Sequence, residues 1–282
     1  MPVIETSDAC TMYYSEECHA DPWGPEPETV LLVHGMAESS RSWTAWVPHL
    51  SRRYRVVRVD LPGFDRSTVD IATYDFSIAS LATELANFLA VTGWESAHIV
   101  GAKLGGSVSL DFASRFPERT RSVTALTGPL WAEGNGRISH QPDIPGNVTA
   151  AGTEQWAGET MGYRLGSGVS DAQRKWWAKL MGATNKDLVA RAANRNAGLD
   201  LRPRLSLIQA KALMITSQAS RLANGPSRDL WNAEVHDNYG FLVLPVDGYH
   251  VAAALPDLCA DIVAAFIGGA SPTELAQIDL KA

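Results

Sequence analysis

Short apolar runs alternate with amphipathic segments along much of this chain, and this alternation restricts the fold more than any other feature. The expected strands cover residues 29–35, 54–59, 99–100 and 123–126. Amphipathic segments separate them, among them residues 36–50 and 74–92. In residues 74–92 apolar residues recur close to every 3.6 positions, with Asp75 as the expected N-cap and Gly93 as the expected stop. Strands and helices in alternation predict crossover connections between parallel strands, with helices on both faces of the sheet.

The rhythm changes between residues 131 and 203, where loop-like sequence gives way to several helical segments. Strand and helix patterns then resume, with strands expected at residues 212–216 and 241–246. We therefore predict an α/β fold with a mostly parallel central sheet of about eight strands and a helical insertion. Residues 1–130 and 204–282 form the predicted core domain, and residues 131–203 form the insertion after the sixth core strand.

Charge and composition exclude several classes of function. The formal net charge of -7 argues against nucleic acid or an anionic membrane as partner, since both favour a concentrated basic surface. Three cysteines without metal-ligand spacing indicate reduced thiols, and we expect neither a metal nor a cofactor. The first residues lack a signal-peptide pattern and no apolar run is long enough to span a bilayer, so we expect a cytoplasmic protein. A small molecule is the expected ligand. Whether the protein forms a homodimer is left open at this point.

The segment H-I-V-G-A-K-L-G-G at residues 98–106 has the layout of a strand-to-helix nucleophile elbow. Gly101 and Gly105 fit this reading, because the sharp turn brings strand and helix too close for a Cβ atom. The residue at the tip is Lys103, where such an elbow usually carries a serine.

Four motifs together resemble the α/β-hydrolase superfamily, in the branch with a helical cap. They are L-L-V-H-G-M at residues 31–36, D-L-P-G-F-D-R-S at 60–67, G-A-K-L-G-G at 101–106 and D-G-Y-H at 247–250. The resemblance implies that His250 is the catalytic histidine and that the backbone N–H groups of Met36 and Leu104 form an oxyanion hole. It also implies a substrate pocket, which we assign to His34, Gly35, Trp131 and Trp156.

The chain departs from the usual Ser-His-Asp triad at two positions. Lys103 replaces the serine, and the loop around Ala219 and Ser220, where the acid would stand, contains no carboxylate. We assign the role of orienting His250 to Glu133, which lies where some similar proteins relocate their acid. The alternatives are Glu38, Asp65 and Asp247.

A lysine at this position makes ordinary acyl-enzyme turnover unfavourable, because an acyl-lysine amide is much harder to hydrolyse than an acyl-serine ester. Three roles remain open for Lys103: a Schiff-base nucleophile, a proton donor or acceptor beside His250, and a holder of an anionic substrate. Desolvation and the helix N-terminus favour the neutral amine, and a nearby carboxylate would reverse that preference.

The function predicted from the sequence is an atypical hydrolase or C–C lyase. Its substrate is a small carbonyl compound, such as a lactone, an ester or a compound with a C–C bond next to a carbonyl. Lys103 and His250 act with a backbone oxyanion hole and without an acyl-serine intermediate. In a less favoured version, His250 alone activates water and Lys103 only orients the substrate. The alternative from another class is a ligand-binding relative that keeps the fold and has lost catalysis.

Overall fold

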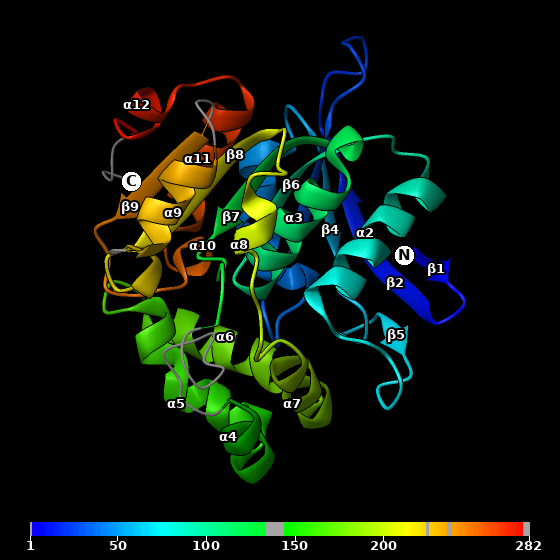
Figure 1. Ribbon diagram of the computed structural model, residues 1–282, viewed down its shortest axis with the longest axis vertical. Helices are drawn as coiled ribbons and strands as arrows, with labels where there is room; N and C mark the ends of the chain where they lie inside the picture. Colours follow the sequence, from blue (N-terminus) through cyan, green and yellow to red (C-terminus); the bar gives the residue numbers. More distant parts are fainter. Residues whose placement is uncertain (1, 133–143, 224–225, 236–238, 279–282) are drawn as a thin grey trace.

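The apolar runs form one nine-stranded sheet in the computed structural model, which describes residues 2–132, 144–223, 226–235 and 239–278 (Figure 1). The strands are β1 (Val3–Ser7), β2 (Cys10–Glu17), β3 (Thr29–Val33), β4 (Arg55–Val59), β5 (Thr68–Val69), β6 (Ala97–Ala102), β7 (Thr120–Leu126), β8 (Lys211–Ser217) and β9 (Tyr239–Leu244). Their order is β1-β2-β4-β3-β6-β7-β8-β9, and β5 pairs with β2.

Only the pairings of β2 are antiparallel among the described strands, and all pairings from β4 to β9 are parallel. The α/β class and the mostly parallel sheet are thus confirmed. The sheet exceeds the expected number of about eight strands because the two-residue β5 also pairs with β2, outside the main strand order.

Helices follow most of the parallel strands. They are η1 (Ser40–Trp46), α1 (Val47–Leu50), α2 (Ile78–Thr92), α3 (Leu104–Arg115), η2 (Pro117–Arg119), α4 (Ile144–Ala151), α5 (Thr153–Leu165), α6 (Asp171–Gly182), α7 (Lys186–Arg195), α8 (Arg202–Leu205), η3 (Arg221–Ala223), α9 (Pro226–Glu234), α10 (Val251–Ala254), α11 (Pro256–Ile267) and α12 (Pro272–Leu275). The η elements are 3₁₀ helices.

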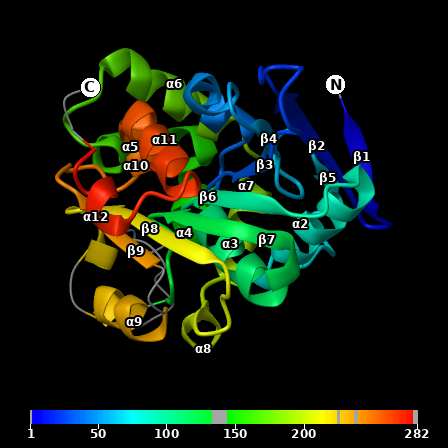
Figure 2. The same cartoon turned by 90° about the horizontal axis from the view of Figure 1, so that it is seen from above.

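Successive residues of the central strands belong to two different apolar cores. Val30 and Leu32 pack with η1 and α11, whereas Leu31 and Val33 pack with α2 and α3 on the other face. Figure 2 shows α11 on one side of the strands and α3 and α8 on the other. Complete burial of each such side chain contributes about 1.5–3 kcal/mol. The sheet is therefore a rigid support for the loops at its carboxyl edge.

The helical insertion lies between β7 and β8 and includes α4 to α7, drawn in green and yellow-green below the sheet in Figure 1. It reaches the carboxyl ends of the parallel strands, because Thr184 donates a hydrogen bond to the Ala37 carbonyl just after β3 (3.1 Å). Division of the chain into a core domain and a cap domain at residues 131 and 203 stays a prediction.

Two of the expected helices begin later than the sequence pattern suggests. Residues 36–50 do not form one helix, because Pro48 has no backbone N–H and a 3₁₀ segment precedes the short α1. The helix expected at residues 74–92 begins at Ile78 instead, with Ser77 as N-cap in place of Asp75, whose carboxylate accepts hydrogen bonds from Ser77. Gly93 ends this helix in the left-handed conformation, as expected.

The three cysteines are free thiols in the structure. Burial raises the pKa of Cys10 to about 11, which makes this thiol unreactive at neutral pH. Among the described residues, no helix combines the length and the apolar character needed to cross a membrane.

Candidate active site

Lys103 stands at the turn between β6 and α3 in a strained backbone conformation. Its φ of 55° and ψ of −115° are unusual for a residue with a side chain. The Lys103 N–H donates to the Leu126 carbonyl on β7 (2.9 Å), and the Lys103 carbonyl accepts from Ser107 N–H (3.1 Å). The surrounding sheet and helix therefore hold this residue at the carboxyl edge of β6.

The two glycines flanking Lys103 are needed for close packing. A Cβ atom on Gly101 would lie 2.1 Å from the Gly105 carbonyl oxygen, and one on Gly105 would lie 2.1 Å from the Val33 oxygen. These contacts are with backbone atoms, so no side-chain rotation relieves them. The sequence thus specifies a helix that starts directly against β3 and β6.

Replacing Gly105 with alanine should lower the free energy of unfolding by up to about 3 kcal/mol, because the new methyl group overpacks the turn. Gly158 is the matched control, since an alanine Cβ in the middle of α5 would meet nothing within 4 Å. Gly158→Ala should stabilise the protein by roughly 0.5–1 kcal/mol. Urea unfolding followed by circular dichroism measures both changes, and a destabilisation of equal size in the two variants would contradict this view of the turn.

Glu38 is the carboxylate that the fold brings to Lys103. It follows β3 in a tight turn where Ala37 has a positive φ of 59°. The Gly35 N–H donates to Glu38 Oε2 (3.1 Å), and the Glu38 N–H donates to the Gly35 carbonyl (3.2 Å). Lys103 Nζ donates to Glu38 Oε1 at 2.9 Å. The Glu38 side chain is fully buried and that of Lys103 is 10% exposed, so this is an interior ion pair.

His250, which follows the last strand of the sheet, contacts the same carboxylate. It follows β9 in the D-G-Y-H turn and precedes α10. Its Nε2 atom lies 3.0 Å from Glu38 Oε1, but the ring has no hydrogen bond of good geometry at Nε2 to any described residue. The His250 N–H donates to the Arg164 carbonyl of α5 (2.8 Å), and the Trp177 ring of α6 lies 5.1 Å from the imidazole. The helical insertion thus supports the histidine.

Burial and neighbouring charges fix the protonation states of Glu38 and His250. Burial alone would raise the pKa of Glu38, but the charge of Lys103 and the contact with His250 hold that pKa well below its usual range. Burial lowers the pKa of His250 more than the Glu38 charge raises it. At neutral pH the site therefore contains a carboxylate and a neutral imidazole.

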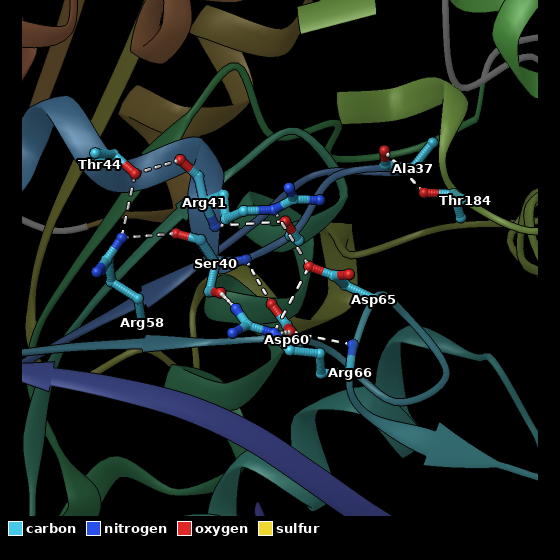
Figure 3. A network of polar contacts seen from close by, with 10 residues as sticks. Ala37, Ser40, Arg41, Thr44, Arg58, Asp60, Asp65, Arg66 and Thr184 are labelled. Atoms are coloured by element: carbon cyan, nitrogen blue, oxygen red, sulfur yellow. Dashed lines mark hydrogen bonds and ion pairs between the residues drawn. The ribbon is translucent and has the colours of Figure 1, made fainter. Parts of the chain in front are cut away.

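A polar network holds the segment that carries Glu38 (Figure 3). The Ser40 N–H donates to the buried carboxylate of Asp60 (2.6 Å), and the Asp60 carboxylate also accepts from the Arg66 N–H (3.3 Å). Asp65, one of the alternative acids, belongs to this network, where it pairs with Arg41 (3.4 Å) and Arg66 (3.8 Å). Asp65 therefore stabilises this loop through its two arginine partners, and its ion pairs do not include Lys103 or His250.

The other predicted acids lie elsewhere. Asp247 accepts from the Ser167 N–H (2.9 and 3.0 Å) and ties the histidine turn to the insertion. Ser220 follows β8, and its hydroxyl accepts from the Leu222 N–H (3.2 Å). Glu133, which we assigned to orient His250, lies outside the described residues. Glu38 is therefore the acid that the described structure brings to His250.

The predicted pocket residues divide between the loop after β3 and the insertion. His34 is fully buried and serves that loop, since its Nδ1 lies 2.8 Å from the Gly35 carbonyl and its Nε2 accepts from the Leu61 N–H (2.9 Å). Trp131 pairs with Asp200 in an isolated bridge, and Trp156 is buried under the guanidinium of Arg164 (4.6 Å to the ring centre).

The two residues predicted to form the oxyanion hole adjoin the ion pair. Met36 comes one residue after Gly35, and Leu104 is the first residue of α3. Among the described residues, no acceptor is found for the N–H of either residue. Both amides are available to hold a developing negative charge.

Sequence reasoning missed three side chains near His250. Tyr249 lies with its ring 5.5 Å from Lys103 Nζ, Trp177 contacts the imidazole, and Arg164 donates to the Tyr249 hydroxyl (2.7 Å). The position of Tyr249 next to His250 was the one available signal. The two insertion residues gave none, because no local pattern relates them to residue 250.

Comparison with known proteins identifies the family. A family model described as alpha/beta hydrolase fold matches residues 28–233. The chain is 37% identical over 107 residues (38% of this chain and 28% of the relative) to the dihydrolipoyllysine-residue acetyltransferase component of the acetoin cleaving system of Cupriavidus necator. It is 35% identical over 138 residues (49% of this chain and 50% of the relative) to the pimeloyl-(acyl-carrier protein) methyl ester esterase of Aeromonas hydrophila. The chain thus spans half or less of the length of these curated relatives.

A solved structure extends the likeness over nearly the whole chain. The enol-lactonase from Burkholderia xenovorans superposes with a TM-score of 0.82 at 16% identity, covering 95% of this chain and all of that one. At this identity the likeness concerns the fold alone. Since the family model covers well over half of the sequence and the sheet has the matching topology, the chain belongs to the α/β-hydrolase family.

Proposed function

We propose that this protein is an enzyme that acts on a small carbonyl compound, namely an ester, a lactone or a compound with a C–C bond next to a carbonyl. Lys103 and His250 carry the reaction, and water replaces the usual serine as nucleophile. The observation that supports this proposal is the shared carboxylate of Glu38, which lies 2.9 Å from Lys103 Nζ and 3.0 Å from His250 Nε2.

The ion pair with Glu38 favours an electrostatic role for Lys103 over a role as Schiff-base nucleophile. A Schiff base needs a neutral amine, whereas the buried carboxylate of Glu38 stabilises the ammonium form. An ammonium group next to the reacting carbonyl stabilises negative charge on oxygen and holds an anionic group of the substrate. We therefore assign Lys103 to electrostatic stabilisation, with the N–H groups of Met36 and Leu104 as further donors.

His250 supplies the proton transfer in this scheme. The neutral imidazole removes a proton from water while the water oxygen forms a bond to the carbonyl carbon, and the carbonyl π electrons move onto the oxygen. When the adduct collapses, the bond to the leaving oxygen or carbon breaks. Protonated His250 then returns the proton to that leaving atom, so the imidazole is neutral again at the end of the cycle.

The helical insertion acts as a cap in this proposal, and the turn at Lys103 acts as the elbow of the active site. The Arg164 carbonyl of α5 accepts a hydrogen bond from the His250 N–H, and the Trp177 ring of α6 packs against the His250 imidazole. The names of two similar proteins, a methyl ester esterase and an enol-lactonase, support esters and lactones as the first substrates to test.

Replacing Lys103 with methionine should lower kcat/KM for ester or lactone hydrolysis by about 100-fold or more, the usual effect of losing one group that stabilises the oxyanion. The measurement uses purified protein and a panel of small esters and lactones. Lys175→Ala is the matched control, because Lys175 is an exposed lysine of α6 and should leave kcat/KM unchanged.

Two results would overturn this assignment. Wild-type turnover in Lys103→Met would remove the lysine from the reaction. A covalent substrate adduct on Lys103 after borohydride treatment of a ketone or aldehyde mixture would replace the ammonium role with the Schiff-base route.

The ion pair also favours a second candidate, a ligand-binding protein without catalysis. Glu38 already neutralises the amine inside the protein, so Lys103 and Glu38 together fill the position of the usual nucleophile. In that case an ester or lactone from the panel would bind and be recovered unaltered, and turnover by the wild type would equal that of the Lys103→Met protein.

A further inference from the structure

Arg164 is a buried cation that has no carboxylate partner among the described residues. The residue is 3% exposed and belongs to α5, next to the histidine turn. Its Nε donates to Thr160 Oγ1 (2.8 Å) and its Nη1 donates to the Tyr249 hydroxyl (2.7 Å), so both partners are neutral. In the part of the chain that the structure describes, no carboxylate lies within ion-pair distance of this guanidinium.

Two other arginines of the same insertion are paired with carboxylates. Arg174 on α6 contacts Asp171 at 3.1 Å, and Arg195 on α7 contacts Asp75 at 2.6 Å, although both side chains are partly exposed. A buried charge costs far more than an exposed one when it lacks a partner. Contact with the Trp156 ring at 4.6 Å offsets part of that cost but adds no negative charge.

Two cations approach the ring of Tyr249. Lys103 Nζ lies 5.5 Å and the Arg164 guanidinium carbon 5.9 Å from its centre. The Glu38 carboxylate is already paired with Lys103, and the neutral imidazole adds no charge. Among the residues that the structure describes here, one positive charge is therefore left over.

We propose that Arg164 binds a carboxylate of the substrate, so that the substrate is an ester, lactone or related carbonyl compound that also carries a free carboxylate. This inference rests on the proposed function, because it assigns a group of the substrate to the same site. The planar guanidinium suits a carboxylate, which accepts two parallel hydrogen bonds from it. The Arg164 carbonyl accepts from the His250 N–H (2.8 Å), so the backbone of Arg164 is fixed directly to the turn that carries His250.

Binding without turnover tests this inference separately from catalysis. The probes are the dicarboxylates from succinate to suberate and their neutral diamides, measured by isothermal titration calorimetry on the full chain. The wild type should bind a dicarboxylate more tightly than its diamide. In Arg164→Met the Kd of that dicarboxylate should rise by roughly 30-fold or more, as when one partner of a buried charge pair is removed.

Arg174→Met is the matched control, since Arg174 lies in the same insertion but already has Asp171 as partner, and its Kd should equal that of the wild type. Arg164→Lys keeps the charge and serves if Arg164→Met does not fold; it should bind with intermediate affinity. Equal Kd values in wild type and Arg164→Met, or in wild type and Arg164→Lys if only the latter folds, would overturn the inference. So would equal affinity of the wild type for dicarboxylates and their diamides. If Lys103→Met kept wild-type turnover while dicarboxylate binding still depended on Arg164, the proposed function alone would fail.

Discussion

Replacing Glu38 with glutamine should lower the free energy of unfolding by about 3–5 kcal/mol, because it leaves the Lys103 ammonium group buried without a counter-charge. The Glu38 side chain is fully buried, so water cannot replace the lost charge. Glutamine has nearly the same shape and keeps an oxygen for the Gly35 N–H, so the change isolates the charge. Urea unfolding of the purified variant measures the loss.

A second substitution separates the ion pair from other effects of the Glu38 change. The double variant Glu38→Gln/Lys103→Met removes both charges and should recover most of the stability lost in Glu38→Gln. Glu26→Gln is the surface control, because Glu26 pairs with Arg55 but is 79% exposed, and it should cost at most about 1 kcal/mol. Equal losses in Glu38→Gln and Glu26→Gln would contradict a buried ion pair.

Replacing His250 with alanine should reduce kcat/KM roughly 100- to 10,000-fold, the usual effect of removing a general base. Lys103 and the two backbone N–H groups of Met36 and Leu104 would remain, so some catalysis over water should persist. His49→Ala provides the control, since His49 lies at the surface between Asp257 and Asp261 and should leave the rate unchanged.

The pH dependence of the rate shows whether burial or the Glu38 charge dominates the pKa of His250. Burial lowers the pKa of His250, and the imidazole acts as a base only when neutral. The rate should therefore be constant from neutral pH down to below about 6.5, the ordinary histidine value, and then fall as His250 takes up a proton. An acid limb with its midpoint above 6.5 would show that the Glu38 charge outweighs burial at this histidine.

The sequence was sufficient for the fold because its apolar patterns are local. Glycine-terminated runs such as residues 29–35 and the periodic segment ending at Gly93 have one structural reading each. The helix start at Ile78 and the 3₁₀ segment before α1 were missed, since capping by Ser77 and the effect of Pro48 compete with the hydrophobic period. Boundaries thus depend on single residues, whereas the order of elements depends on whole segments.

The candidate site was predictable only in part. Lys103 and His250 follow from motifs in the chain, and Glu38 was one of several acids left open. The contact of Glu38 with both residues joins the ends of β3, β6 and β9, which no local pattern relates. Arg164 lies still further from any motif, because only the packing of the insertion brings it to Tyr249.

The most direct test of the account is kcat/KM of four proteins on one carboxylate-bearing ester: wild type, Lys103→Met, His250→Ala and the double variant. If both side chains serve one step, each single variant should lose most of the activity. The double variant should then be no more than a few-fold slower than the slower single variant. Hydrolysis that is equally fast in all four proteins would contradict a catalytic role for Lys103 and His250.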